Sequence, residues 1–363
     1  MAVLDPFMPC PFPSIMSRNI QIETVQAHRS RAGMASLMMR RTAHHLALHI
    51  QPWYRIGLWC FEREAVSPPF IMNLLSDDAL LWSWIALAVL VFPVLFLVSA
   101  PYGRHLRTGW GPTLRSDLGW IIQESPSFLI MAVYLTRWLR QRTDKLLKLG
   151  FDEREWMTVT LAFCWLVHYA NRAFVFPLRM RGGSKPTTFT VVSTAILFCV
   201  INTYLNAKAL FVYELVIRSR RSLDWAFCSG LLLWVCGLIG NWHSDAITRA
   251  LRRNPEEIKE KRYAIPYGGL YRYVSAPNYF SEFVEWTGFA IAAQTWAAFS
   301  FALWTFSNLY PRARSNHQWY LENFAEYKSL NRNAFFPNPL KSAAVRARAP
   351  QRRGASSHQQ KSR

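Results

Sequence analysis

The sequence is poor in acidic residues and in the short patterns that mark soluble nucleotide-binding and metal-binding proteins. It holds 22 Asp and Glu against 42 Lys and Arg, a net charge of +20. No G-x-G-x-x-G occurs, and the pair Gly182-Gly183 follows no strand-like run, which excludes a Rossmann domain. No C-x-x-C occurs either, so the cysteines are interpreted as buried apolar fillers rather than a disulfide framework or metal site. They are Cys10, Cys60, Cys164, Cys199, Cys228 and Cys236.

Apolar residues, by contrast, are abundant and gathered in long runs. The chain is 51% hydrophobic and 15% aromatic, and runs of membrane length are typical of a polytopic membrane protein. The fourth and sixth runs are long enough for one tilted helix or two short ones. We therefore expect an all-α fold with six or seven transmembrane helices around a buried cofactor and substrate cavity. The predicted spans are residues 79–99, 118–138, 156–176, 187–217, 225–245 and 280–309.

The excess of basic residues gives information about binding partners and about the orientation of the chain in the membrane. In a soluble protein a pI near 10.1 would suggest nucleic acid as a partner. In a membrane protein the excess belongs in the loops, where it sets topology. The odd-numbered loops and the tail from Pro311 carry the larger excess of Lys and Arg. This predicts that they lie in the cytosol and the N-terminus in the lumen, with the lipid bilayer and no nucleic acid as partner.

The two ends of the chain differ from the middle. Residues 1–78 contain no clean apolar core of a secretory signal, and the Arg-rich stretch 34–50 fits either a targeting peptide or a poorly ordered extension. Residues 341–363 are basic and rich in Ala, Gln and Ser, which predicts a disordered cytosolic tail. The transmembrane domain is expected over residues 79–340. The sequence carries no signal for the oligomeric state.

Polar residues recur at helical spacing inside or beside three of the apolar runs. Such side chains are costly at membrane depth and mark functional sites by default, the alternative being a helix end that emerges into water. Ser275 and Pro277 are a suitable cap and first-turn proline for the helix that carries the second stripe. The stripes are Asn241, Asp245, Arg249 and Arg252; Asn278, Glu282 and Glu285; and Asn202 and Asn206.

A carboxyl group also lies near the start of the second apolar run, in Trp-x-x-Gln123-Glu124-x-Pro126. Burial away from water would keep Glu124 protonated, so that it could donate a hydrogen bond to a ketone oxygen. The alternative is a Glu at the membrane interface in contact with water. The third run contains His168-Tyr169-x-x-Arg172, where an aromatic residue by itself is more typical of packing than of chemistry.

These motifs together resemble a known family. N-x-H-S-D-x-x-x-R-x-x-R over residues 241–252, followed by Y-x-I-P-x-G-G-L-Y-x-Y-V-S-x-P-N-Y-F-x-E-x-x-E-W-x-G-F-A over 263–290, is similar to the C-terminal signature of the steroid 5α-reductases. Those proteins are membrane-embedded 3-oxo-5α-steroid 4-dehydrogenases that use NADPH. W-x-x-Q-E-x-P and H-Y-x-x-R-x-F-V also match, and the resemblance runs from about Tyr102 to Pro337.

The resemblance implies an activity and a role for each site residue. NADPH would deliver hydride to C5 of a 3-oxo-Δ4 steroid while Glu124 and Tyr169 hold the 3-keto oxygen, with Gln123 and Arg172 on the substrate side. It implies a multi-pass protein of the endoplasmic reticulum and no metal. The cofactor residues that it implies are Tyr102, Lys185, Asn241, Asp245, Arg249, Arg252, Tyr263, Asn278, Glu282, Arg312, Asn316 and Tyr320.

The chain departs from the family pattern at several places. Ala264 stands where relatives usually have a basic residue, and the linker 254–261 is longer than usual. Asn316 occupies the usual histidine position, so that either Asn316 or the adjacent His317 would take its role. The proline that normally follows the late tyrosine is absent after Tyr327. These differences affect the residues expected to contact the cofactor, and they do not involve Gln123 or Glu124.

Two other functions stay open at this point. One is reduction of another conjugated lipid double bond, in a polyprenal or a trans-2-enoyl-CoA, which the Gln123-Glu124 pair disfavours relative to a steroid. The other is a sterol-binding relative without turnover, suggested by Ala264 and Asn316.

Overall fold

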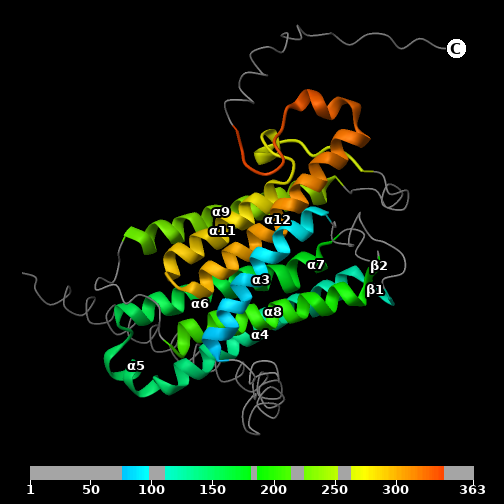
Figure 1. Ribbon diagram of the computed structural model, residues 1–363. Coiled ribbons are helices and arrows are strands. Elements are labelled where there is room, and N and C mark those ends of the chain that lie inside the picture. The colour runs from blue at the N-terminus through cyan, green and yellow to red at the C-terminus, as the bar shows by residue number, and fades with distance from the viewer. Residues whose placement is uncertain (1–75, 98–110, 181–185, 214–224, 252–262, 339–363) are drawn as a thin grey trace, which may run out of the picture. The chain divides into compact units, whose positions relative to one another are not determined.

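The computed structural model of the protein describes residues 76–97, 111–180, 186–213, 225–251 and 263–338 (Figure 1). Nearly all of them are helical, as predicted. The elements in chain order are α3 (Asp77–Leu97), β1 (Thr113–Arg115), α4 (Ser116–Gln141), α5 (Thr143–Leu149), α6 (Glu153–Ala170), the π-helical turn η2 (Asn171–Val175), α7 (Phe176–Leu178), β2 (Pro186–Thr188), α8 (Phe189–Phe211), α9 (Trp225–Ala250), the 3-10 turn η3 (Gly269–Arg272), α11 (Pro277–Ala293), α12 (Trp296–Asn323) and the 3-10 turn η4 (Ala325–Leu330).

Five of these segments are long and apolar enough to cross a membrane. They are α3; α4; the continuous segment Glu153–Leu178, which comprises α6, η2 and α7; α8; and α9. The sixth predicted span is divided into α11 and α12 by Gln294, which has a left-handed backbone with φ of 50°. Thr295 then caps α12, since its hydroxyl accepts the Ala298 N–H at 3.1 Å. The all-α polytopic fold is therefore confirmed, with the last predicted span formed by two helices.

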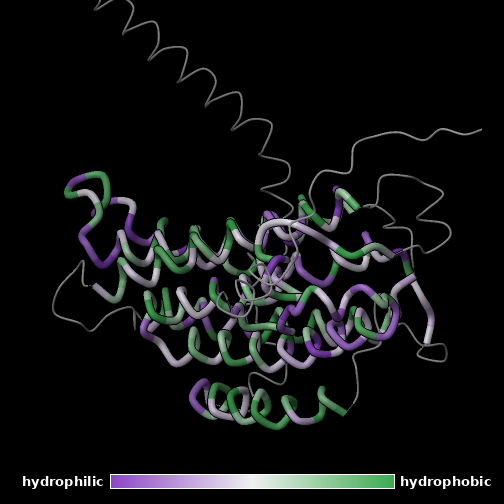
Figure 2. The backbone as a smooth tube through the Cα atoms, turned by 90° about the horizontal axis from the view of Figure 1, so that it is seen from above, coloured by the Kyte–Doolittle hydropathy of each residue, from purple (hydrophilic) through white to green (hydrophobic). Residues whose placement is uncertain are grey.

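The outer surface of the bundle is apolar. Leu90, Phe163 and Leu232 each expose more than 60% of their surface, and hydrophobic stretches colour every long helix in Figure 2. A soluble protein rarely exposes such an area, whereas lipid chains accommodate it. The prediction that the cysteines are buried fillers was wrong for Cys228 and Cys236, which are exposed on α9. Cys164 and Cys199 are buried, and Cys10 and Cys60 lie outside the described residues.

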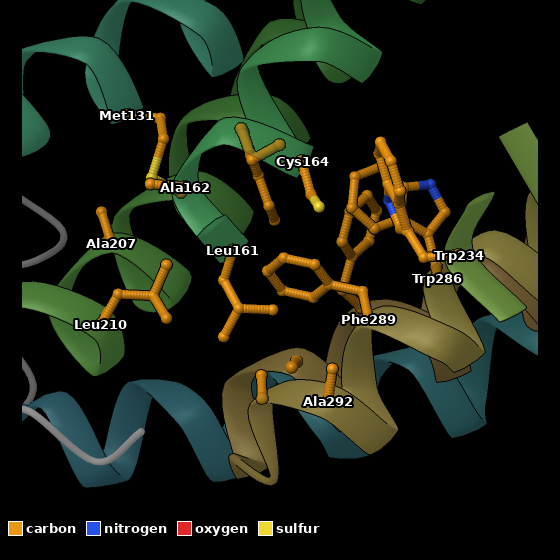
Figure 3. Close-up of a cluster of buried hydrophobic side chains, with 14 of the residues drawn as sticks. Met131, Leu161, Ala162, Cys164, Ala207, Leu210, Trp234, Trp286, Phe289 and Ala292 are labelled. Carbon is orange, nitrogen blue, oxygen red and sulfur yellow. The ribbon is translucent and has the colours of Figure 1, made fainter. Parts of the chain in front are cut away.

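The main core is built of aromatic side chains between α6, α11 and α12. The Trp165 ring lies 5.2 Å from that of Trp286, 5.7 Å from that of Phe289 and 5.1 Å from that of Phe301. Figure 3 shows Phe289 of α11 directed toward Leu161 of α6. This rigid packing holds in place the polar residues that follow on the same helices.

Helices α9 and α11 lie side by side and in unusually close contact (Figure 1). A Cβ atom added at Gly237 of α9 would lie 2.4 Å from the Glu285 backbone nitrogen of α11. A Cβ at Gly230 would lie 2.5 Å from the Ala292 nitrogen, and Gly288 is equally confined by α9. Small residues therefore let the two backbones meet, as is common between membrane helices. The two polar stripes lie on these helices.

Two short strands far apart in the sequence, β1 and β2, pair antiparallel and fix the starts of α4 and α8. Thr113 pairs with Thr188, Leu114 with Thr187 and Arg115 with Pro186. The two helices then run parallel and pack along their length, from Gly119 beside Val192 to Trp138 beside Phe211. No strand was predicted here, because three residues are too few to produce a pattern.

Candidate active site

The end of α6 presents three polar side chains to the interior. A capping box starts the helix: the Asp152 carboxylate accepts the Glu155 N–H at 3.0 Å and the Glu155 carboxylate accepts the Asp152 N–H at 2.9 Å. At the other end His168 and Tyr169 occupy the last turn, and Arg172 lies in the π-helical turn η2. Such turns often occur at functional sites because the extra residue redirects side chains.

Arg172 lies between two carboxylates from different helices. Its guanidinium nitrogens are 3.7 Å from Asp245 Oδ2 on α9 and 3.6 Å from Glu282 Oε2 on α11. The guanidinium carbon also lies 4.9 Å from the centre of the Trp120 ring. A planar cation suits this arrangement, since it can stack on an aromatic ring and contact carboxylates at its edge. Arg172 was predicted on the substrate side, but its direct contacts are with predicted cofactor residues.

Amide groups connect the two polar stripes. Asn241 Nδ2 donates to the Asn278 carbonyl at 3.1 Å and to Glu282 Oε2 at 3.3 Å. Asn278 Nδ2 donates to Asp245 Oδ1 at 3.2 Å. Asn241 and Asp245 are buried, so this part of α9 is not a helix end emerging into water. Arg249 lies one turn further along α9, within electrostatic range of Asp245.

Gln123 and Glu124 lie beside Tyr169. Gln123 Nε2 donates to Glu124 Oε1 at 3.2 Å, and Cys199 Sγ of α8 lies 3.8 Å from Glu124 Oε2. Tyr169 is buried within electrostatic range of both Glu124 and Cys199. Arg172 and Glu282 are electrostatic neighbours of Glu124 as well. The predicted substrate residues and the predicted cofactor residues are thus contiguous.

The local sequence explains how α4 tolerates a proline two residues after Glu124. Pro126 has no N–H to donate to the Ile122 carbonyl one turn earlier. The Ser125 hydroxyl lies 3.4 Å from that carbonyl oxygen and takes the place of the missing donor. The helix therefore continues, and Glu124 stays on its inner side.

A buried pair that was not predicted joins α6 to α11. His168 Nδ1 lies 2.7 Å from Glu285 Oε1, and both side chains are almost completely buried. The His168 ring contacts those of Tyr169 and Trp286, with centroids 5.0 and 4.6 Å away. The spacing in the sequence could have indicated this pair. His168 lies four residues before Arg172, and Glu285 lies three residues after Glu282. Two antiparallel helices with these spacings would bring His168 to Glu285 and Arg172 to Glu282.

The segment after α12 folds back onto the start of α11. Ser275 Oγ lies 2.6 Å from His317 Nδ1 and accepts the Tyr327 hydroxyl at 2.7 Å. Burial raises the pKa of Tyr327, so its hydroxyl keeps the proton that it donates. Tyr320 is buried and stacks on Tyr327 with ring centroids 4.8 Å apart. Of the two residues at the usual histidine position, His317 therefore contacts the loop that leads into α11.

The remaining predicted cofactor residues fall in two groups. Arg312 lies 5.6 Å from the Tyr279 ring, and Tyr263 packs on Trp319 with centroids 5.1 Å apart, so both are near the start of α11 or the end of α12. Asn316 is partly buried on α12. Tyr102, Lys185 and Arg252 lie outside the described residues. Among the residues that the structure describes, no three His, Cys, Asp or Glu side chains come together to hold a metal ion.

Comparison with known proteins points to one family. A family model described as 3-oxo-5-alpha-steroid 4-dehydrogenase matches residues 185–339. The chain is 36% identical to the 3-oxo-5-alpha-steroid 4-dehydrogenase 1 of Bos taurus over 255 residues, 70% of this chain and 94% of the relative. It is 39% identical to the protein of that name from Mus musculus over 69% of this chain and 92% of the relative. Identity to the steroid 5-alpha-reductase DET2 of Arabidopsis thaliana is 35%, over 67% of this chain and 89% of the relative.

Proposed function

The chain belongs to the steroid 5-alpha-reductase family, and from this premise we propose that it reduces the 4,5 double bond of a 3-oxo-Δ4 steroid with NADPH as reductant. It is a membrane protein and an oxidoreductase acting on CH–CH groups. The observation that carries the proposal is the contiguity of Glu124 and Tyr169 with the Asp245–Arg172–Glu282 cluster inside an apolar bundle.

The residues present fit a dinucleotide. Asp245 Oδ2 is buried and accepts no hydrogen bond within the described part of the chain, although Arg172 is close by. A carboxylate oxygen in that state suits an O–H or N–H of a ribose or carboxamide. Bound NADPH would supply the hydride. The residues proposed to hold it are Tyr102, Lys185, Asn241, Asp245, Arg249, Arg252, Tyr263, Asn278, Glu282, Arg312, Tyr320 and either Asn316 or His317.

The chain's own contribution to the reaction is electrostatic. Addition of hydride at the β carbon of an enone places negative charge on the ketone oxygen, and donors already fixed at that oxygen lower the barrier. Glu124 and Tyr169 are proposed as the two donors. Gln123 orients Glu124 through the 3.2 Å hydrogen bond, and Arg172 supplies positive charge nearby. The apolar helices keep bulk water away from these groups, which strengthens each interaction.

The test is an assay of membranes that contain the protein. They would be incubated with NADPH and testosterone, a polyprenal or a trans-2-enoyl-CoA, and the products separated by mass spectrometry. We expect the 5α-reduced 3-oxo steroid. If only the polyprenal or the thioester is reduced, the substrate is another lipid and not a steroid. If steroid binds without oxidation of NADPH, the protein is a non-catalytic relative.

We further expect Glu124→Gln to lower steroid turnover more than tenfold, because the amide is a weaker donor than a carboxylic acid. Binding of NADPH, measured by quenching of tryptophan fluorescence, should stay within twofold of the unmodified protein. Full activity of this variant would remove Glu124 from the mechanism.

A further inference from the structure

The two carboxyl oxygens of Glu124 have partners from two different helices. Oε1 accepts a hydrogen bond from Gln123 Nε2 on α4 at 3.2 Å. Oε2 accepts one from the thiol of Cys199 on α8, with Sγ 3.8 Å away. Glu124 is therefore the acceptor in both contacts, and each of its oxygens is held from a separate direction.

This arrangement determines where the acid hydrogen of Glu124 can go. A protonated carboxyl group has one O–H donor and keeps lone pairs that accept. The Gln123 amide nitrogen can only donate, and the Cys199 thiol donates as well. Neither neighbour therefore takes the acid hydrogen, which stays available for the ketone oxygen of a substrate.

A contact on each oxygen is needed to fix the plane of the carboxyl group. The last torsion angle of a glutamate side chain has a broad, shallow minimum, so the group turns easily unless it is held. A donor aimed at a reacting oxygen is effective only when its neighbours keep it in that direction. Gln123 holds Oε1 only, and Cys199 supplies the contact at Oε2.

The fold places the Cys199 thiol beside both proposed donors. Cys199 is buried on α8, which packs along α4. It is an electrostatic neighbour of Tyr169 as well as a partner of Glu124. A buried free cysteine is usually a small apolar filler, and Cys164 of α6 is such a residue in the aromatic core. Cys199 differs from it by its contact with a carboxyl group.

We propose that Cys199 is a positioning residue, whose thiol holds Glu124 Oε2 so that the acid hydrogen is directed at the ketone oxygen of the substrate. This inference rests on the proposed function and adds a residue to the Gln123-Glu124 pair. Cys199 acts through Glu124 as a hydrogen-bond donor, and its sulfur forms no bond with the substrate.

The experiment compares Cys199→Ala with Cys199→Ser in the full-length protein. Alanine and serine have similar volumes, so both variants lose the same packing and differ by one hydroxyl donor. Cys199→Ala should lower kcat for testosterone about threefold or more, as expected for the loss of one hydrogen bond. Cys199→Ser should recover most of kcat, because its hydroxyl can donate to Oε2 after a small rotation of the Glu124 side chain. NADPH binding should be the same in both variants.

Cys164→Ala is the matched control. It removes the same sulfur from the aromatic core, so it should lower Tm while kcat stays within about twofold of the unmodified protein. If kcat falls equally in Cys199→Ala and Cys199→Ser, the loss follows volume and the inference is overturned, with the proposed function intact. If the unmodified protein does not reduce testosterone, the proposed function fails, and with it the role of this contact.

Infrared spectroscopy tests the hydrogen bond itself, independently of turnover. The S–H stretching band of Cys199 is identified as the one that disappears in Cys199→Ala. Glu124→Leu removes the acceptor, so this band should move to higher frequency while the Cys164 band stays in place. An unmoved Cys199 band would show that the thiol does not donate to Glu124 and would overturn the inference whether or not the steroid is reduced.

Discussion

At the scale of single residues, the polar side chains of this bundle are matched by their spacing on antiparallel helices. His168 and Arg172 of α6 and η2 contact Glu285 and Glu282 of α11, so one turn of each helix carries two pairs. Arg172 contacts Asp245 and Glu282, which are both predicted cofactor residues. The His168 contact lies next to Tyr169, with the two ring centroids 5.0 Å apart.

We expect the His168–Glu285 pair to position Tyr169. Glu285→Ala should destabilise the protein by roughly 3 kcal/mol, because it leaves a buried His168 without its partner. It should also lower kcat more than it lowers affinity for NADPH, since the ring that packs on Tyr169 would lose its anchor. Unfolding temperature, kcat and NADPH binding would be measured together.

Glu285→Gln is the conservative control for this pair. The amide oxygen can still accept from the imidazole, so most of kcat should return. Equal loss of kcat in the Gln and Ala variants would contradict a positioning role based on this hydrogen bond.

The sequence allowed much of the site to be anticipated, because helical spacing places residues on a face without knowledge of the fold. The stripes through Asn241 and Asn278 do meet in the structure. What spacing does not contain is the partner across the interface. The contacts of Arg172 with Asp245 and of His168 with Glu285 depend on which helices are neighbours and on their register.

At the scale of helices, the closest contact is that between α9 and α11. Gly237→Ala should destabilise the protein by roughly 1 to 3 kcal/mol, because the added Cβ would meet the Glu285 nitrogen and the Ser281 carbonyl, and backbone atoms cannot rotate away. The forced separation should also weaken NADPH binding, since Asn241 and Glu282 lie on the two separated helices.

Gly240→Ala is the control for this contact. Its Cβ would meet the Ser281 side-chain oxygen at 2.6 Å, and that hydroxyl can change rotamer. Thermal unfolding in detergent should therefore show a smaller effect at Gly240 than at Gly237. The reverse order would mean that the helices can separate without cost at this point.

The presence of the long helices was predictable from the sequence, but two local features were not: the break between α11 and α12, and the pairing of β1 with β2. The break between α11 and α12 occurs at Gln294 and Thr295, where neither glycine nor proline marks it. The β1–β2 strand pair also gives no sequence signal, because each strand has only three residues and the two lie far apart in the sequence. Both are determined by tertiary packing, which overrides weak local preference.

At the scale of the whole molecule, the site lies toward one end of the helices. Asp245 is near the end of α9, Asn278 begins α11 and Tyr320 is near the end of α12. The opposite ends carry another set of charges. Lys208 and Tyr204 of α8 bind Asp77 at the start of α3, and Lys145 binds Asp152 before α6. The two ends are thus chemically distinct, and one faces each side of the membrane.

The orientation that we expect has the cofactor end in the cytosol of an endoplasmic reticulum membrane, because the loops and tail at that end hold the larger excess of Lys and Arg. A glycosylation acceptor sequence inserted after Gly150, between α5 and α6, should be modified in the lumen. The same acceptor added to the C-terminus should stay unmodified and accessible to protease in intact microsomes. Modification of the tail instead would reverse the topology and place the proposed NADPH residues on the lumenal side.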